Sequence, residues 1–450
     1  MAFFTKERSF YKTFISLWGV LVLNNVIVLG VNLADNIMLG AYSEPALSGA
    51  AACNQLQFIF QQVIFGLGNT AVLLGSQYWG EKKLKPIKNI AASALICGVL
   101  FSLVLFILTS AFPYQTVGIF TKSEVIKQQG VEYLSVIKYT YPVFAVTNIL
   151  LACLRSVESV KIGFRVSVMT LIVNISLNYV LIFGKLGFEP MGAKGAATAT
   201  LISRIAELLF VVIHIMFIEK NLRLSFGDMV KTDLPLFKKY ALSSIPFVLT
   251  DGLFGVSTAL QTVILGHMSD AAIAANSVST TLYQVLKVAA IGSSAASAVI
   301  IGKSIGQGKS LDKIKEYSRS LQVIYVGVGL ATSVLLFLLR TPIISLYNIS
   351  SEAVSLADGF LLVLCVTCIG TAYQMPTNTG IVRGGGDSKF VLKLDIVAIW
   401  CIVLPLSFCA AFRWHWHPIA VIACLNADQV FKCLPVFIKA NSYNWVKKLT

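Results

Sequence analysis

The chain has 450 residues, of which 56% are hydrophobic and 13% are charged, and its mean hydropathy is +0.77. Soluble domains carry about 25% charged residues, so this composition excludes an ordinary soluble fold and indicates an integral membrane protein. The formal net charge is +15. It does not indicate a nucleic-acid partner, because the basic residues lie in short segments between apolar runs, where they act as membrane topology signals.

Apolar runs of 18 or more residues predict membrane-spanning helices. The chain contains twelve such runs, at about 14–39, 47–77, 90–111, 131–153, 166–184, 195–218, 241–265, 272–301, 320–339, 359–381, 394–412 and 418–438. The sequence therefore predicts an all-α integral membrane protein with twelve transmembrane helices.

The distribution of basic residues predicts the orientation of these helices. With the N-terminus placed in the cytoplasm, the cytoplasmic segments hold 26 of the 36 Lys and Arg residues and the external loops hold six. Such a bias places both termini in the cytoplasm. The longest cytoplasmic connection predicts a boundary, giving an N-terminal lobe at 1–219, a linker at 220–240 and a C-terminal lobe at 241–450. The expected location is the plasma membrane, or the cytoplasmic membrane of a bacterium.

The two predicted lobes are copies of one another. When the second half is aligned on the first without gaps, Gly80 falls on Gly306, and a two-residue insertion further on places Arg155 on Arg383. A nearly constant offset over about 120 residues indicates an internal repeat. Because each copy has an even number of spans, the copies are parallel and related by an axis along the membrane normal, as in several transporter folds.

Short glycine-rich and polar motifs lie at the ends of these spans and carry a family resemblance. The chain resembles the multidrug and toxic-compound extrusion (MATE) family of the multidrug/oligosaccharidyl-lipid/polysaccharide exporter superfamily. The resemblance implies two pseudo-symmetric six-helix bundles around a V-shaped central cavity. It also implies a secondary active antiporter that exports amphipathic, often cationic organic compounds in exchange for Na⁺ or H⁺. The segments that carry it are 32–40 (NLADNIMLG), 75–80 (GSQYWG), 302–308 (GKSIGQG), 174–179 (NISLNY), 192–200 (GAKGAATAT) and 383–389 (RGGGDSK).

The first half contains a candidate ion-coupling site. The resemblance makes Asp35, near the external end of the first span, its leading carboxylate. Asn174 and Asn178 are four residues apart and share one face of the fifth span, and Thr200 can add a hydroxyl oxygen from the sixth. Related sequences usually carry Asp at the position of Asn178. Amide oxygens can ligate Na⁺ but cannot carry a proton, so both coupling ions stay open, with Na⁺ at Asp35, Asn174 and Asn178 as the only metal expected. No cofactor is expected.

The second half contains Asp251, five residues after Pro246, as a second candidate coupling acid. Lys287 lies in the middle of the eighth span, where a charge needs a partner, and Asp251 is the expected one. Such a pair would be either a structural bridge or a proton-switched gate. Further polar residues either line the substrate cavity, together with Lys287, or join helices to one another; they are Gln61, Tyr283, Tyr373, Gln374 and Asn378.

Two other pairs of charges have the spacing of neighbours on one helix face. Arg204 and Glu207 are three apart, and Asp428 and Lys432 are four apart, so we expect each pair to neutralise itself and to be structural.

Two other functions fit the sequence less well. A flippase for a lipid-linked oligosaccharide precursor needs a cationic cavity, to which only Lys287 clearly contributes. An enzyme is not expected, because neither an HExxH nor a GxSxG motif is present. The expected partners are small organic substrates and the lipid bilayer, without nucleic acid, and the protein is expected to act as a monomer.

Overall fold

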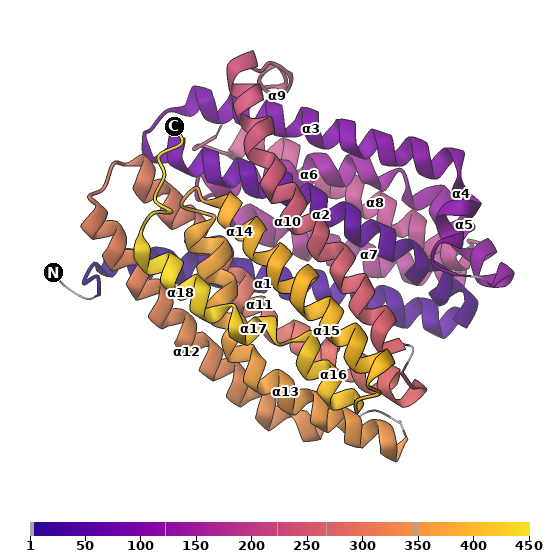
Figure 1. Ribbon diagram of the computed structural model, residues 1–450. Coiled ribbons are helices and arrows are strands. Elements are labelled where there is room, and N and C mark those ends of the chain that lie inside the picture. The colour runs from indigo at the N-terminus through magenta and orange to yellow at the C-terminus, as the bar shows by residue number, and fades with distance from the viewer. Residues whose placement is uncertain (1–3, 122, 223, 267, 346, 348–349) are drawn as a thin grey trace. The chain divides into compact units, whose positions relative to one another are not determined.

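The computed structural model describes all residues except 1–3, 122, 223, 267, 346 and 348–349 (Figure 1). The described part of the chain is helical, and no strand is assigned within it. The helices are α1 (Arg8–Tyr42), α2 (Glu44–Gly80), α3 (Leu84–Ala111), α4 (Pro113–Gly118), α5 (Glu124–Ile137), α6 (Thr140–Ser156), α7 (Lys161–Phe183), α8 (Gly192–Ile213), η1 (His214–Ile218), α9 (Phe226–Val230), α10 (Leu234–Gly266), α11 (Asp270–Gly306), α12 (Leu311–Ile344), α13 (Ser351–Met375), η2 (Pro376–Val382), α14 (Ser388–Asp395), η3 (Ile396–Val403), α15 (Leu404–Phe408), η4 (Cys409–Arg413), α16 (Pro418–Leu425), α17 (Asp428–Phe431) and α18 (Cys433–Ser442).

The predicted number of spans is confirmed. Among the described residues, 11 helices are long and apolar enough to cross a membrane, and there are 12 if the bent pair α5–α6 is one span. The two parts of that pair meet at 53°. The break, at residues 138–139, lies just before the first turn of α6, in which Pro142 has no N–H to donate to the carbonyl four residues earlier.

The ends and bends of the helices differ in detail from the predicted runs. Helix α1 begins at Arg8 and ends at Tyr42, so it extends beyond the apolar run 14–39, because polar residues at the membrane surface continue the helix. The tenth span changes to wider π turns at Pro376. In the eleventh span, Pro405 lies in the short helix α15, between the π-helical segments η3 and η4.

The described residues form two compact units. Unit 1 comprises Met1–Val22, Ser76–Lys82 and Leu253–Thr450, and unit 2 comprises Leu23–Gly75 and Lys83–Gly252. The division falls inside α1, α2 and α10, so each of these helices contributes to both units. The predicted lobes at 1–219 and 241–450 stay a prediction. The two units are defined by which residues pack together, and this does not identify the six spans of each repeat.

In unit 1, the last described segment, 443–450, packs onto the end of α2 and the turn after η2, which carry two of the sequence motifs. Trp445 is fully buried, and the backbone N–H of Lys447 donates to the Gly385 carbonyl oxygen at 2.9 Å. The Gln77 amide donates to the Lys447 carbonyl at 3.1 Å and accepts from the Leu449 N–H at 2.7 Å. This segment therefore holds the end of α2 within unit 1.

Candidate functional site

Four of the predicted ion-coupling residues meet in unit 2. Asn178 of α7 donates a hydrogen bond from Nδ2 to the Asp35 carboxylate of α1. It also donates from Nδ2 to Oδ1 of Asn174 at 3.0 Å. Nδ2 of Asn174 in turn lies 3.5 Å from the Thr200 hydroxyl of α8. The i, i+4 spacing on α7 places both amides on the face that meets α1 and α8. Both asparagines are buried.

This cluster has one carboxylate and an excess of oxygen acceptors. Asn178 uses its amide nitrogen for both bonds, and its buried Oδ1 has no hydrogen-bond partner among the residues that the structure describes. A buried acceptor without a donor is uncommon and needs an explanation. Carboxylate, amide and hydroxyl oxygens are the ligands of hard cations, and a carboxylate can instead take a proton. The arrangement fits either coupling ion.

Asp251 lies in unit 2 and contacts a residue that the sequence analysis missed. The Asn69 side chain of α2 donates to Asp251 Oδ2 at 3.1 Å. Gly66 allows this approach, since a Cβ there would lie 2.9 Å from the Cα of Val248 on α10. The Asn69–Asp251 hydrogen bond therefore joins α2 to α10 close to this contact. A polar residue inside an apolar run is the signal that identifies Asn69.

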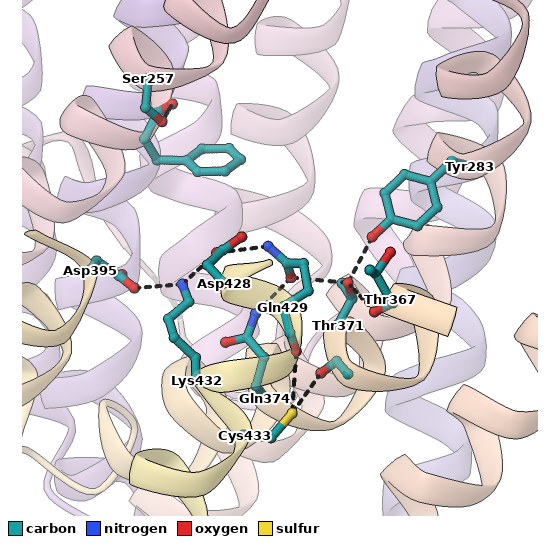
Figure 2. A network of polar contacts seen from close by, with 12 residues as sticks. Ser257, Tyr283, Thr367, Thr371, Gln374, Asp395, Asp428, Gln429, Lys432 and Cys433 are labelled. Atoms are coloured by element: carbon teal, nitrogen blue, oxygen red, sulfur yellow. Dashed lines mark hydrogen bonds and ion pairs between the residues drawn. The ribbon is translucent and has the colours of Figure 1, made fainter. Parts of the chain in front are cut away.

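In unit 1, a polar network surrounds the predicted Asp428–Lys432 pair (Figure 2). The pair is confirmed, with Nζ 3.1 Å from Asp428 Oδ2. A second carboxylate, Asp395 of α14, lies 3.0 Å from the same ammonium. Lys432 therefore bridges two acids, while the Gln429 amide donates to Asp428 at 2.9 Å. Sequence spacing had indicated only one of these acids.

The network continues to two residues that were predicted to line a cavity. Gln374 of α13 donates to Gln429 Oε1 at 2.9 Å, and the Thr371 hydroxyl donates to the same oxygen at 3.0 Å. The Tyr283 hydroxyl of α11 lies 2.7 Å from the Thr371 hydroxyl. A chain of hydrogen bonds therefore leads from Asp428 to Tyr283 (Figure 2). Here these side chains join helices, which was the alternative expectation for them.

Lys287 of α11 lies beside the end of this chain. Its ammonium is 5.5 Å from the centre of the Phe254 ring and 5.9 Å from the centre of the Tyr283 ring. Within the described residues, no carboxylate lies within ion-pair distance of it. Asp251 belongs to unit 2 and Lys287 to unit 1, so the predicted pair of these two residues stays a prediction.

The other predicted residues and pairs are placed as follows. Arg204 and Glu207 form their expected pair at 2.8 Å. The Tyr373 hydroxyl donates to Gln322 Oε1 at 2.8 Å. Asn378 is buried, and its Oδ1 has no hydrogen-bond partner in the described part of the chain. Gln61 is half-buried in α2. Among the described residues, no group of three or more His, Cys, Asp or Glu side chains has the geometry of a metal site.

Comparison with known proteins gives matches along nearly the whole chain. The MatE family model matches residues 21–180 and again 246–409. The two matched segments are displaced from one another by nearly the same amount at their starts and at their ends, in agreement with the internal repeat. A relative from Thermotoga maritima, described as a probable multidrug resistance protein NorM, is 23% identical over 94% of this chain and 90% of its own length. The transporter YisQ of Bacillus subtilis, described as uncharacterized, is 22% identical over 92% of this chain and 90% of its own length.

Solved structures share the fold. The Vibrio cholerae MATE transporter VcmN superposes with a TM-score of 0.87 at 15% identity, and 98% of each chain is covered. A transporter of the MOP superfamily from Pyrococcus furiosus, described as having a binding pocket of reverse polarity, superposes with a TM-score of 0.86 at 17% identity. The match covers 97% of this chain and 96% of that chain. These similarities show the twelve-helix fold. They do not identify the substrate or the coupling ion of this chain.

Proposed function

Because this chain belongs to the MatE family, we propose that it is a secondary active multidrug efflux transporter that exports amphipathic, often cationic organic compounds in exchange for Na⁺ or H⁺. The single observation that carries the coupling proposal is the buried cluster of Asp35, Asn178, Asn174 and Thr200. The names of the relatives favour efflux over the flippase alternative. The protein is a multi-pass membrane protein, and we propose that it acts as a monomer in the plasma or cytoplasmic membrane.

The proposed coupling follows from the cost of a charge inside a membrane span. An ionised carboxylate there is stable only with a partner. Asn178 supplies one hydrogen bond to Asp35, and a proton or Na⁺ would neutralise the remaining charge. For Na⁺, the unpartnered Oδ1 of Asn178 is available as a further ligand. Loading and unloading thus change the charge of unit 2 by one. A ligand that prefers one charge state of the site shifts the protein toward the conformation that holds that state.

The experiment is dye transport in proteoliposomes under an imposed gradient of Na⁺ or of H⁺. Rhodamine 123, a monocationic amphipathic dye, is a suitable probe. We expect gradient-driven movement of the dye by the wild type and loss of the gradient dependence in Asp35→Asn. Glu189→Gln is the matched control, because it removes an exposed carboxylate and should leave transport unchanged. Exchanging Na⁺ for K⁺ at fixed pH, and then varying pH at fixed Na⁺, identifies the ion.

Two outcomes would contradict the proposal. Dye movement that ignores both gradients would exclude antiport. Full gradient-driven transport by Asp35→Asn would leave antiport standing but would remove the assigned coupling site. Asn178→Ala adds a further test, because loss of the amide should change the ion dependence without removing the carboxylate.

A further inference from the structure

Lys287 and Lys432 of unit 1 lie within the predicted apolar runs, and their surroundings differ. The ammonium of Lys432 is buried between the carboxylates of Asp395 and Asp428, at 3.0 and 3.1 Å. The ammonium of Lys287 has no carboxylate within ion-pair distance among the described residues, and its contacts are the faces of two aromatic rings. Ring faces attract a cation but do not neutralise it. Within the described residues of unit 1, Lys287 is therefore a positive charge without a paired carboxylate.

Lys287 also stands next to a polar stripe on α11. Ser277, Thr281 and Gln284 are exposed at spacings of four and three residues, and Lys287, which is half-buried, follows three residues later. These spacings place the three exposed side chains along one side of the helix. Polar side chains on a membrane span face protein or water rather than lipid, and these three are exposed. Lys287 therefore lies beside an exposed polar side of α11, and its own side chain is partly accessible.

We propose that Lys287 binds a carboxylate of the transported compound. A carboxylate would pair with the Lys287 ammonium through a charge-assisted hydrogen bond, which is stronger than a hydrogen bond between neutral groups. The rings of Phe254 and Tyr283, within 6 Å of the same nitrogen, offer apolar surface to the organic part of the compound. Pockets for organic ligands combine apolar walls with a few such polar groups in this way.

The polar network fixes one wall of this site. The Tyr283 hydroxyl is held by Thr371, and Thr371 is held by Gln429. This chain of bonds keeps the Tyr283 ring in place under the ammonium. It also uses the Tyr283 hydroxyl within unit 1, so that the ammonium of Lys287 is the group that remains for the ligand.

The inference rests on the proposed function and adds to its substrate class organic compounds that carry an acidic group, including zwitterions. Rhodamine 110 and rhodamine 123 test it, because they share one fluorophore and differ only in that rhodamine 123 carries a methyl ester where rhodamine 110 carries a free carboxylate. Binding of each dye to the purified full-length protein in lipid nanodiscs is measured by fluorescence polarisation. This measurement needs no ion gradient.

We expect Lys287→Met to weaken binding of rhodamine 110 by about tenfold or more, the range for a lost hydrogen bond to a charged group, with little change for rhodamine 123. Lys287→Arg should retain the preference for the carboxylate dye. Lys231→Met is the control for net charge, because it removes an exposed lysine and should change neither affinity. If Lys287→Met does not fold, Lys287→Gln replaces it.

Three results would overturn the inference. These are equal affinity of wild type and Lys287→Met for rhodamine 110, an equal loss for both dyes, and no binding of either dye to the wild type. Failure of the proposed function is separate and is observed in the proteoliposomes. Dye binding that depends on Lys287 without gradient-driven movement would refute antiport and keep the carboxylate site.

Discussion

The ammonium of Lys432 should be the most stability-critical charge in unit 1. Its side chain and that of Asp428 are each 5% exposed, and that of Asp395 is 19% exposed. Lys432→Met leaves two carboxylates next to one another in a dry site. Removing one partner of a buried ion pair costs about 3–5 kcal/mol. We place Lys432→Met in the upper part of that range, because two acids lose their partner.

Asp395→Asn should be much milder. It leaves Lys432 and Asp428 as a one-to-one pair, and the new amide oxygen can still accept a hydrogen bond from the ammonium. We expect a loss of about 1 kcal/mol, the value of one ordinary hydrogen bond. The double variant Lys432→Met/Asp395→Asn should be more stable than Lys432→Met alone, because it removes one of the two opposed carboxylates.

The assay is equilibrium unfolding in mixed micelles, followed by tryptophan fluorescence and circular dichroism, for the two single variants and the double variant. The coupling energy of the cycle should be at least about 1 kcal/mol, as for residues in direct contact. The reasoning is refuted if Asp395→Asn costs as much as Lys432→Met, or if the losses simply add in the double variant.

Three further predictions concern packing, pH and topology. Gly306→Ala should destabilise the protein by about 1–3 kcal/mol in thermal unfolding, because the new Cβ would lie 1.9 Å from a carbonyl oxygen at the end of α2. Gly327→Ala should be neutral or stabilising, because no atom lies within 4 Å of its new Cβ. The Lys88 side chain bonds to Asp228 at 2.9 Å and, together with hydrogen bonds from Ser225, lowers the pKa of that carboxyl to about 2. Because the pKa of Asp228 is lower in the folded state, the stabilisation of the folded protein by this pair is present above the unfolded pKa near 3.8 and is lost as pH falls toward 2. Lys88→Met should remove the stabilisation due to the pair, which is below about 1 kcal/mol because the pair is partly exposed. Alkaline phosphatase, which is active only outside the cytoplasm, should be active when fused in the loop before α8 and inactive when fused in the loop before α10.

Contacts within one helix could be predicted from the sequence, because helical spacing fixes which residues share a face. This is why Asn174 and Asn178 were placed together, and why the Asp428–Lys432 pair was expected. The position of Asp35 beside them followed from resemblance to a family motif and not from spacing. The apolar runs predicted the spans for a similar reason, since a span is recognised by the length of one continuous apolar segment.

Contacts between helices distant in the chain could not be predicted in this way. Asp395 lies 37 residues before Lys432, and Asn69 lies 182 residues before Asp251, and no periodicity relates such positions. The break between α5 and α6 did leave a signal, because Pro142 stands two residues inside the second helix. Hydropathy does not detect that signal, because an apolar run has the same mean hydropathy whether its helix is straight or bent.

The repeat register shows how the duplicated halves came to differ in charge. In the register that places Gly80 on Gly306, Asp35 falls on Gln261, and Lys287 falls on Gln61. Each charged residue therefore has a neutral amide of similar size as its counterpart in the other half. Such an exchange keeps a polar side chain at the position while confining the charge to one copy. Neutralising one charge then alters one half alone, so an ion can act on the acid of the first half while the lysine of the second half keeps its charge for the acidic group of a substrate.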